Sequence, residues 1–240
     1  MKIAAIIPAR YQSSRFPGKP LADINGWPMI RHVYERTKQA KHPDRVIVAT
    51  DDERIKRAVE DFGGEAVMTS PEHGSGTDRL AEAAERLEAG VIINVQGDEP
   101  LIRPEMIDQA VEPLVSDSSV EIATLKSRIT DDAEINDPNV VKVVTDEENN
   151  ALYFSRWPVP YNRQGAEDVN YYKHIGLYVY RKEILLKISR WKPTGLEVCE
   201  CLEQLRVLEH GHKIRVRETR YSSWGVDVPV DLEAIKQKLE

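Results

Sequence analysis

Four residues near the start of the chain carry the chemical groups that hold a polyphosphate. Two guanidinium groups, a hydroxyl and an ammonium occur in one short stretch, at Arg10, Ser13, Arg15 and Lys19. They follow residues 3–7, a continuous apolar run that predicts a strand buried on both faces of a parallel sheet. The loop at the carboxyl end of such a strand is where open α/β sheets bind ligands. The stretch therefore predicts an anion-binding loop, and a solvated basic turn is the alternative that spacing alone leaves open.

This loop differs from the common phosphate-binding motifs. Pro20 follows Gly18-Lys19 where a Walker A loop has Ser or Thr, and the chain contains no G-x-G-x-x-G sequence. Gly18 nevertheless lets the backbone approach a ligand closely. The loop thus suits a polyphosphate without matching either fingerprint.

A second loop of small residues lies between a short strand at residues 65–68 and a helix that continues to Leu87. It includes Ser75-Gly76-Thr77-Asp78-Arg79, in which Thr77 or Asp78 is expected to cap the helix. An ordinary helix-entry loop has the same composition, so this loop by itself leaves ligand binding open.

Carboxylates suited to a hard metal ion occur at two distant positions. Asp98 follows the buried strand predicted at residues 91–95, within Gln96-Gly97-Asp98-Glu99-Pro100, where an acid at a strand's carboxyl end suits a divalent cation. Asp227 precedes Pro229 near the end of the chain. A turn role for Asp98 and a helix N-cap role for Asp227 are the competing interpretations.

The elements that must position these loops alternate strand and helix in the first half of the chain, which predicts a parallel sheet with right-handed crossovers. From about Glu121 the pattern changes to shorter strands separated by turns. Strands are expected at residues 3–7, 45–50, 65–68, 91–95, 122–127, 140–145, 151–154, 171–180 and 214–217. Helices are expected at residues 28–39, 51–62, 77–87, 104–115, 181–190 and 196–210, and from residue 230 onward.

Composition indicates an ordinary globular protein of one large domain, because 41% of the 240 residues are hydrophobic and 30% are charged. The net charge of −7 gives no general attraction for nucleic acid. We expect no membrane span and no signal peptide, since the apolar runs are short. Cys199 and Cys201 are two apart in a predicted helix and poorly placed to bridge, so we expect reduced thiols in a cytoplasmic protein.

The stretch IPARYQSSRFPGKPL resembles the signature of the sugar-activating cytidylyltransferases, and further matching segments follow in order along the chain. These segments are HGSGTDR, QGDEP, YFSRWPVPY, YKHIGLYVYR, VCECLEQLRVLEHG and GVDVPVDLE. The resemblance implies a three-layer α/β/α nucleotidyltransferase (Rossmann-like) fold with a mixed sheet. It also implies that residues 1–240 form one domain, in which about 121–180 contribute a small β-rich lobe for sugar binding and dimerisation.

The family's reaction transfers a cytidylyl group from CTP to the anomeric hydroxyl of a sugar acid and releases pyrophosphate. The KHIGLY and LEQLR segments favour 3-deoxy-D-manno-octulosonate (Kdo) as the acceptor, and hence a role in lipopolysaccharide biosynthesis. The resemblance further implies Mg²⁺ as cofactor and a homodimer, with an interface near Tyr178 and the β lobe.

The resemblance also assigns residues to roles. Catalysis is expected of Arg10, Lys19 and Asp98, and metal binding of Asp98 and Asp227. The nucleotide is expected to contact Ala9, Arg10, Ser13, Arg15, Lys19, Ser75, Gly76, Arg79 and Gln96. The sugar acid is expected to contact Arg156, His174, Glu203 and Gln204, with the Arg156 fork on its carboxylate.

Three alternative functions remain open at this point. The first is a cytidylyltransferase for a related sugar acid, such as 8-amino-Kdo or sialic acid. The second is a metal-dependent glycosyltransferase that uses Asp98, which would not release pyrophosphate from CTP. The third is a non-enzymatic nucleotide-binding regulator, which would have no evident use for two metal-binding acids.

Overall fold

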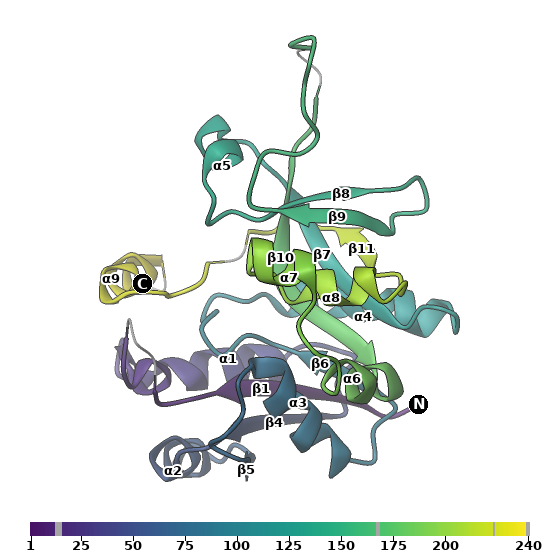
Figure 1. Ribbon diagram of the computed structural model, residues 1–240. Helices are drawn as coiled ribbons and strands as arrows, with labels where there is room; N and C mark the ends of the chain where they lie inside the picture. The colour runs from purple at the N-terminus through teal and green to yellow at the C-terminus, as the bar shows by residue number, and fades with distance from the viewer. Residues whose placement is uncertain (13–15, 167–168, 223, 239–240) are drawn as a thin grey trace.

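The structure is a computed structural model that describes residues 1–12, 16–166, 169–222 and 224–238. Nine strands of the described chain form one mixed sheet (Figure 1): β1 (Ile3–Ala9), β4 (Arg45–Thr50), β5 (Ala66–Met68), β6 (Val91–Asn94), β7 (Ile122–Arg128), β8 (Lys142–Thr145), β9 (Ala151–Ser155), β10 (Tyr172–Arg181) and β11 (Arg215–Glu218). The strand order is β11-β7-β10-β6-β1-β4-β5, with β8 paired to β10 and to β9. β10 runs antiparallel to β6 and β7, whereas β1 is parallel to β4 and β6. β2 (Asp23–Ile24) and β3 (Trp27–Pro28) form a separate small hairpin.

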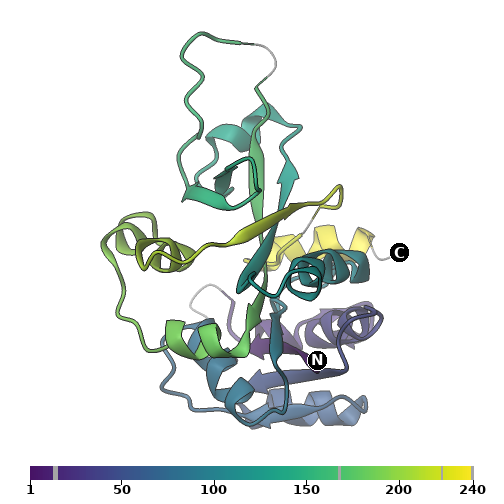
Figure 2. The ribbon, with the colours of Figure 1, turned by 90° about the vertical axis from the view of Figure 1, so that its right-hand side faces the viewer.

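Helices cover both faces of the sheet, as the edge-on view in Figure 2 shows. They are α1 (Met29–Lys38), α2 (Glu53–Asp61), α3 (Gly76–Glu85), α4 (Pro104–Ser116), α5 (Asp132–Asn136), α6 (Lys182–Ile188), α7 (Gly195–Glu200), α8 (Gln204–Glu209) and α9 (Pro229–Lys238). One hydrophobic core joins the sheet to α1, α2 and α4, and a second joins its other face to α3, α6 and α8. The predicted three-layer α/β/α fold with a mixed sheet is confirmed.

The apolar run at the start of the chain forms the strand that the sequence predicts. Successive side chains of a strand point to opposite faces, so β1 contributes to both cores. Ala5 and Ile7 lie in the core under α1, while Ala4 and Ile6 lie in the core under α3. The continuous apolar character of this segment therefore follows from its helix-covered position between β6 and β4.

Two local predictions were wrong in detail. Ser75, rather than Thr77 or Asp78, caps α3: its side chain accepts from the Asp78 N–H, and the Asp78 side chain accepts from the Ser75 N–H. The single helix predicted over residues 196–210 is two helices, because Cys201 adopts a left-handed conformation (φ 51°) after α7. The chain then turns, and α8 begins at Gln204.

Residues 121–180 divide between the main sheet and a projecting part. β7 and β10 lie inside the main sheet, whereas α5, β8, β9 and residues 156–166 extend away from its body (Figures 1 and 2). We call the projecting part, residues 129–166, the lobe. No helix of the described chain is both long and apolar enough to cross a membrane. Cys199 and Cys201 are exposed, unbridged thiols.

Candidate active site

Two adjoining cavities open where the loops after β1, β5 and β6 meet. The first, which we call the loop cleft, has a volume of about 260 Å³. It is lined by Ala9, Arg10, Lys19, Ser75, Gly76, Arg79, Gln96, Asp98 and Asp227, all of which the sequence had singled out. Ser13 and Arg15, predicted for the same site, lie outside the described residues. Segments separated by more than half of the chain thus meet in one cleft with three cations and two carboxylates.

Two glycines allow the walls of the loop cleft to come together. A Cβ atom on Gly97 would lie 2.7 Å from the Pro8 carbonyl oxygen, so only glycine permits the turn after β6 to pass this close to the end of β1. Gly18 has φ 72°, which favours glycine, and precedes the short 3-10 helix at Lys19–Leu21. Its N–H donates to the Tyr11 carbonyl at 2.9 Å and closes the first loop. These close approaches place Lys19 beside Asp98.

Lys19 is held by both distant segments of the cleft. Its Nζ donates to Asp98 Oδ2 at 2.6 Å and to the Val226 carbonyl at 2.8 Å, and its side chain is only 15% exposed. The Val226 N–H in turn donates to the Asp98 carbonyl at 2.9 Å. The ammonium therefore has a defined position over the cleft, as a group that stabilises developing phosphate charge requires.

The start of α3 forms the side of the loop cleft away from Lys19. Arg79 is buried and donates to Thr69 Oγ1 at 2.5 Å and to Asp51 Oδ2 at 2.7 Å. Its charge is therefore already balanced within the protein. The amino end of α3 at Gly76 lies on the cleft and adds the positive end of a helix dipole, which favours an anion.

Asp98 and Asp227 both line the loop cleft, one from the loop after β6 and one from the segment before α9. No group of three or more His, Cys, Asp or Glu side chains that could hold a metal ion occurs in the described part of the chain. Two carboxylates fit Mg²⁺, which usually keeps waters and binds through one or two carboxylates plus substrate phosphates. At the start of α9, Asp231 Oδ2 accepts from the backbone N–H groups of Asp227 and Val228.

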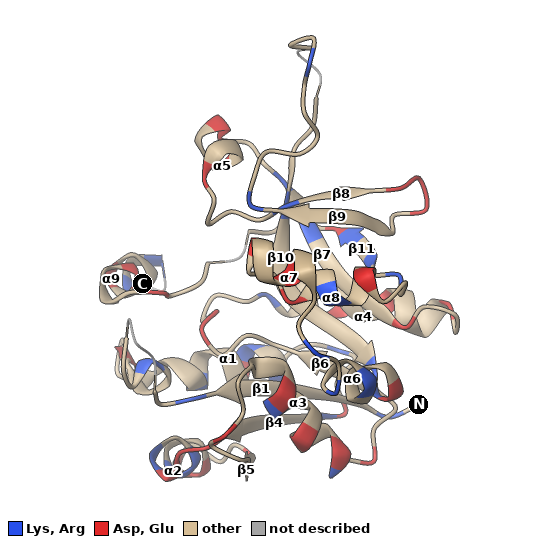
Figure 3. Cartoon of the chain, in the orientation of Figure 1, with Lys and Arg blue, Asp and Glu red and all other residues tan. Residues whose placement is uncertain are grey.

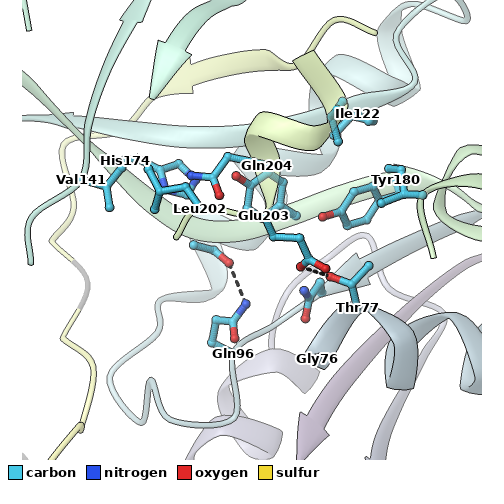
Figure 4. Close-up of a pocket in the computed structure, with 15 residues that line it drawn as sticks. Gly76, Thr77, Gln96, Ile122, Val141, His174, Tyr180, Leu202, Glu203 and Gln204 are labelled. Atoms are coloured by element: carbon cyan, nitrogen blue, oxygen red, sulfur yellow. Dashed lines mark hydrogen bonds between the residues drawn. The ribbon is translucent and has the colours of Figure 1, made fainter. Parts of the chain in front are cut away.

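The second cavity, which we call the sheet pocket, has a volume of about 290 Å³ and shares Gly76 and Gln96 with the loop cleft. The predicted residues His174, Glu203 and Gln204 line it (Figure 4). Figure 4 shows Glu203 reaching from the α8 side toward Thr77, whose hydroxyl donates to Glu203 Oε2 at 2.6 Å. Gln96 Nε2 donates to the Gly176 carbonyl at 3.0 Å, which fixes the boundary between the two cavities.

Several buried polar atoms of the sheet pocket make no hydrogen bond within the described protein. They are Asn94 Oδ1, Tyr178 Oη and Glu203 Oε1, the last of which lies 3.9 Å from the Arg206 guanidinium. Buried polar groups are nearly always paired in native proteins, so such a group of atoms around one cavity indicates a polar ligand. Burial raises the pKa values of the Tyr178 and Tyr180 hydroxyls, which stay protonated. Burial also raises the pKa of the Glu203 carboxyl, against the opposing hydrogen bond from Thr77.

His174 is held as a neutral ring on the wall of the sheet pocket. It lies edge-on to Phe154 and beside Tyr178, and burial there lowers its pKa to about 3. Its Nε2 is 3.1 Å from Thr124 Oγ1, whose single proton is directed to the Ile175 and Leu177 carbonyls. The Thr124 oxygen thus accepts from Nε2–H, and Nδ1 is the acceptor nitrogen.

Arg156, predicted to bind the sugar carboxylate, lines neither cavity. Its guanidinium donates to the carbonyls of Glu200 (2.7 Å), Cys201 (3.3 Å) and Pro138 (2.8 Å). The buried Lys142 ammonium supports this arrangement by donating to the Arg156 carbonyl at 2.6 Å. Arg156 is therefore near the pocket in space, because it contacts Cys201 beside the lining residue Leu202, but its charge is directed to backbone oxygens.

Five polar side chains that line the cavities were not predicted as site residues: His73, Thr77, Asn94, Tyr178 and Tyr180. His73 and Thr77 belong to the HGSGTDR segment, whose resemblance to the family could have predicted that they line the site. The two tyrosines are two apart in β10, and this spacing places both side chains on one face of a strand. Asn94 interrupts a buried apolar strand, which is a signal for a polar environment at that point.

A three-layer α/β fold with a cationic cleft at the ends of its strands, adjoining a pocket lined by hydroxyl, amide, imidazole and carboxyl groups, is the architecture of a nucleotide-dependent transferase. A family model described as Cytidylyltransferase matches residues 4–214. The chain therefore belongs to the cytidylyltransferase family.

Individual relatives are similar over the full length of the chain. A 3-deoxy-manno-octulosonate cytidylyltransferase of Geobacter metallireducens is 57% identical over 249 residues, covering 100% of this chain and 98% of that one. Its counterpart in Geotalea uraniireducens is 58% identical and covers 100% of both chains. The solved structure of CMP:2-keto-3-deoxy-manno-octonic acid synthetase complexed with CTP is 46% identical, with a TM-score of 0.96, and covers 100% of this chain and 98% of that one.

A more distant solved structure shares the fold alone. The 4-diphosphocytidyl-2C-methyl-D-erythritol synthase of Anaerococcus prevotii is 15% identical, with a TM-score of 0.65, and covers 99% of this chain. The α/β/α architecture is therefore common to proteins that differ in most of their residues.

Proposed function

We propose that this protein transfers a cytidylyl group from CTP to the anomeric hydroxyl of Kdo, forming CMP-Kdo and pyrophosphate. The observation that carries the proposal is the contact of two chemically different cavities at Gly76 and Gln96. One is cationic and suits a triphosphate, and the other is lined by hydroxyl, amide and imidazole groups and suits a sugar. The names and full-length similarity of the relatives support CTP and Kdo as the two substrates.

On the nucleotide side, Lys19 and Arg10 act on the phosphates. The defined position of the Lys19 ammonium allows it to neutralise charge on the α-phosphate and on the departing pyrophosphate without reorganisation. Ala9, Ser75, Gly76 and Gln96 contact the base and ribose, while Arg79 shapes the floor of the cleft through its pairing with Asp51. Ser13 and Arg15 are proposed for the same nucleotide.

Asp98 and Asp227 are the proposed ligands of Mg²⁺. The cation supplies charge neutralisation for phosphate oxygens when bound. Asp98 also holds the Lys19 ammonium, at 2.6 Å, and so keeps two positive groups adjacent at the reacting phosphate. Asp227 brings the second carboxylate to the same cleft from the far end of the chain.

On the sugar side, the unpaired atoms of the sheet pocket bind hydroxyl groups. Glu203 Oε1 and the acceptor nitrogen Nδ1 of His174 accept from sugar hydroxyls, and the Gln204 amide adds a further polar contact. The described lining of this pocket contains no cation. We therefore propose that Arg156 exchanges its bonds to the Cys201 and Pro138 carbonyls for the sugar carboxylate, which forms a stronger, charge-assisted pair.

A direct assay separates this proposal from its alternatives. The protein is incubated with Mg²⁺, a sugar acid (Kdo, 8-amino-Kdo or sialic acid) and CTP, ATP or GTP, and pyrophosphate release is measured. The expected result is release with CTP and Kdo, and poor release with purine triphosphates, because the Ser75-Gly76 region leaves room for a pyrimidine. Release with 8-amino-Kdo or sialic acid in place of Kdo would reassign the acceptor, and CTP-dependent chemistry without pyrophosphate would indicate a glycosyltransferase.

We also propose that the protein is a homodimer that works in the cytoplasm. The predicted interface strand is internal, because β10 is paired on both edges and Tyr178 is 8% exposed. The interface is therefore proposed on the exposed apolar side chains of the lobe and α7, namely Leu152, Trp157, Tyr161 and Val198. Two exposed thiols suit a reducing compartment. Light scattering at micromolar concentration tests the dimer, and Trp157→Glu is expected to weaken it.

A further inference from the structure

A third cavity lies outside the two that the proposed reaction uses. We call it the arginine cleft, and its volume is about 640 Å³. Its cationic lining residues come from α1, from the start of α4, from the segment before α9 and from the end of α9: Arg36, Arg103, Arg220 and Lys238. The rest of its described lining is Leu101, Tyr221, Ser222 and Trp224, so no acidic side chain is among the lining residues.

No acid among the described residues lines the arginine cleft to balance its charges, although Tyr221 and, with a smaller effect, nearby Glu105 raise the pKa of the Arg220 guanidinium. Burial, and then repulsion from Arg103, lower the pKa of Arg36. Some exposed arginines elsewhere pair with an acid: Arg54 bonds Asp52 at 2.7 Å, and Arg217 bonds Glu112 at 3.3 Å. Figure 3 shows acidic and basic residues dispersed over the whole ribbon, and the chain has 40 acids against 33 cations. Four cations without an adjacent lining acid are therefore a local departure from the surface as a whole.

Aromatic rings take the place that carboxylates have at other arginines. The Tyr221 ring has the Arg103 and Arg220 guanidinium groups each 5.3 Å from its centroid, and Lys238 Nζ lies 4.1 Å from the Trp224 ring. Cation–π contacts orient a cation without neutralising its charge. The two rings thus hold three of the four charges beside one space, which Arg36 also lines, and leave them available to an anion.

We propose that the arginine cleft is a second anion-binding site that takes phosphoanhydride groups, either inorganic pyrophosphate or the triphosphate of a nucleotide. Several guanidinium forks around one space match the many oxygens of a polyphosphate better than a single carboxylate. The net charge of −7 disfavours nucleic acid as the ligand, because a long polyanion would meet repulsion beyond the cleft. This site is additional to the loop cleft and does not depend on which sugar the enzyme uses.

The arginine cleft and the loop cleft share one segment of the chain. Tyr221 and Trp224 line the former, while Val226, shortly after them, bonds both Lys19 and Asp98 in the latter. Substitutions of the aromatic residues would therefore disturb the reaction site as well. Arg36 lies on α1 and Arg103 immediately precedes α4, and neither lines the loop cleft, so they are the residues to change.

The test is calorimetric titration with inorganic pyrophosphate in the absence of Mg²⁺. Wild type is expected to show two binding events. Lys19→Ala should weaken only the binding of pyrophosphate to the loop cleft. The double variant Arg36→Gln with Arg103→Gln should weaken binding to the arginine cleft at least about tenfold, because two charge-assisted contacts are lost. The double variant should retain wild-type turnover with CTP. A matched control, Arg54→Gln with Arg217→Gln, removes two paired arginines and should leave both events unchanged.

Titration with CTP distinguishes the two ligand sources. If a nucleotide occupies the arginine cleft, wild type binds two equivalents of CTP and the Arg36/Arg103 variant binds one; if only pyrophosphate does, both bind one. Retention of both pyrophosphate events in the Arg36/Arg103 variant, or an equal loss in the Arg54/Arg217 control, would overturn the proposal. Arg103→Gln alone, at an exposed position, repeats the test if the double variant fails to fold.

Discussion

Replacing His174 by Gln should remove a specific part of the acid sensitivity of this protein. The ring has a pKa of about 3 in the folded protein because it is buried beside Phe154 and Tyr178, whereas an unfolded chain has a His pKa near about 6.5. Between these two values the unfolded state binds one more proton than the folded state. The neutral ring therefore contributes stability that is fully present above about pH 6.5 and is lost as the pH falls toward 3.

The size of the effect follows from the linkage relation. Each pH unit below the unfolded pKa costs about 1.36 kcal/mol, so this one group should lower the free energy of unfolding by about 2 kcal/mol between about pH 7.5 and pH 5. That figure requires only that the folded pKa lie well below 5. The Gln variant should lose about 2 kcal/mol less than wild type over the same interval, although removing the bond to Thr124 costs it about 1 kcal/mol at both pH values.

Urea unfolding of wild type and variant at the two pH values measures this difference directly, because every other titrating group is common to both proteins. His174→Asn serves as a control with different packing: its stability at neutral pH should differ from that of the Gln variant, but its pH dependence should not. If wild type and both variants lose the same stability between the two pH values, His174 is not held neutral by burial, and the tautomer assigned to it would fail as well.

Three further outcomes are expected. Lys19→Ala should lower turnover by about a hundredfold or more while weakening CTP binding less, since one electrostatic donor at the reacting group commonly contributes this much. Near-normal turnover would show that the loop after β1 binds the nucleotide without contributing to catalysis. Asp98→Asn and Asp227→Asn should each nearly abolish turnover, and the double variant should be little worse than either. The melting temperature of Asp227→Asn should stay close to wild type, because Asp231 Oδ2 still accepts the N–H groups of residue 227 and Val228. An active variant with a lowered melting temperature would make Asp227 a cap. Arg156→Ala should raise the KM for the sugar acid with CTP affinity unchanged, and a fall in CTP affinity would contradict the division into two cavities.

The nucleotide half of the candidate site was predictable from the sequence because its parts are local. A buried parallel strand is apolar throughout, and the loop at its carboxyl end carries the polar residues that bind a ligand. This pattern repeats after β1 and β6, so Lys19 and Asp98 could be placed on the same edge of the sheet before their contact was seen. Gly97 could be read as a turn residue, but its close approach to Pro8 depends on how two strands pack.

The sugar half depends on contacts that no local pattern contains. Cys201 breaks a segment with helical periodicity, and this break lets Glu203 reach Thr77, far away in the sequence. Arg156 was expected at the sugar carboxylate from its motif, yet its guanidinium donates to backbone carbonyls of both α7 and the lobe.

The arginine cleft is the clearest example of a site that local sequence patterns do not predict. Its four cations come from separate elements, and each alone resembles a solvated surface residue. The periodicity of apolar residues indicates which face of a strand or helix is buried, and it can be recognised from residues that are close in sequence. Which faces then meet, and which charges they bring together without a partner, is decided only when the whole chain packs.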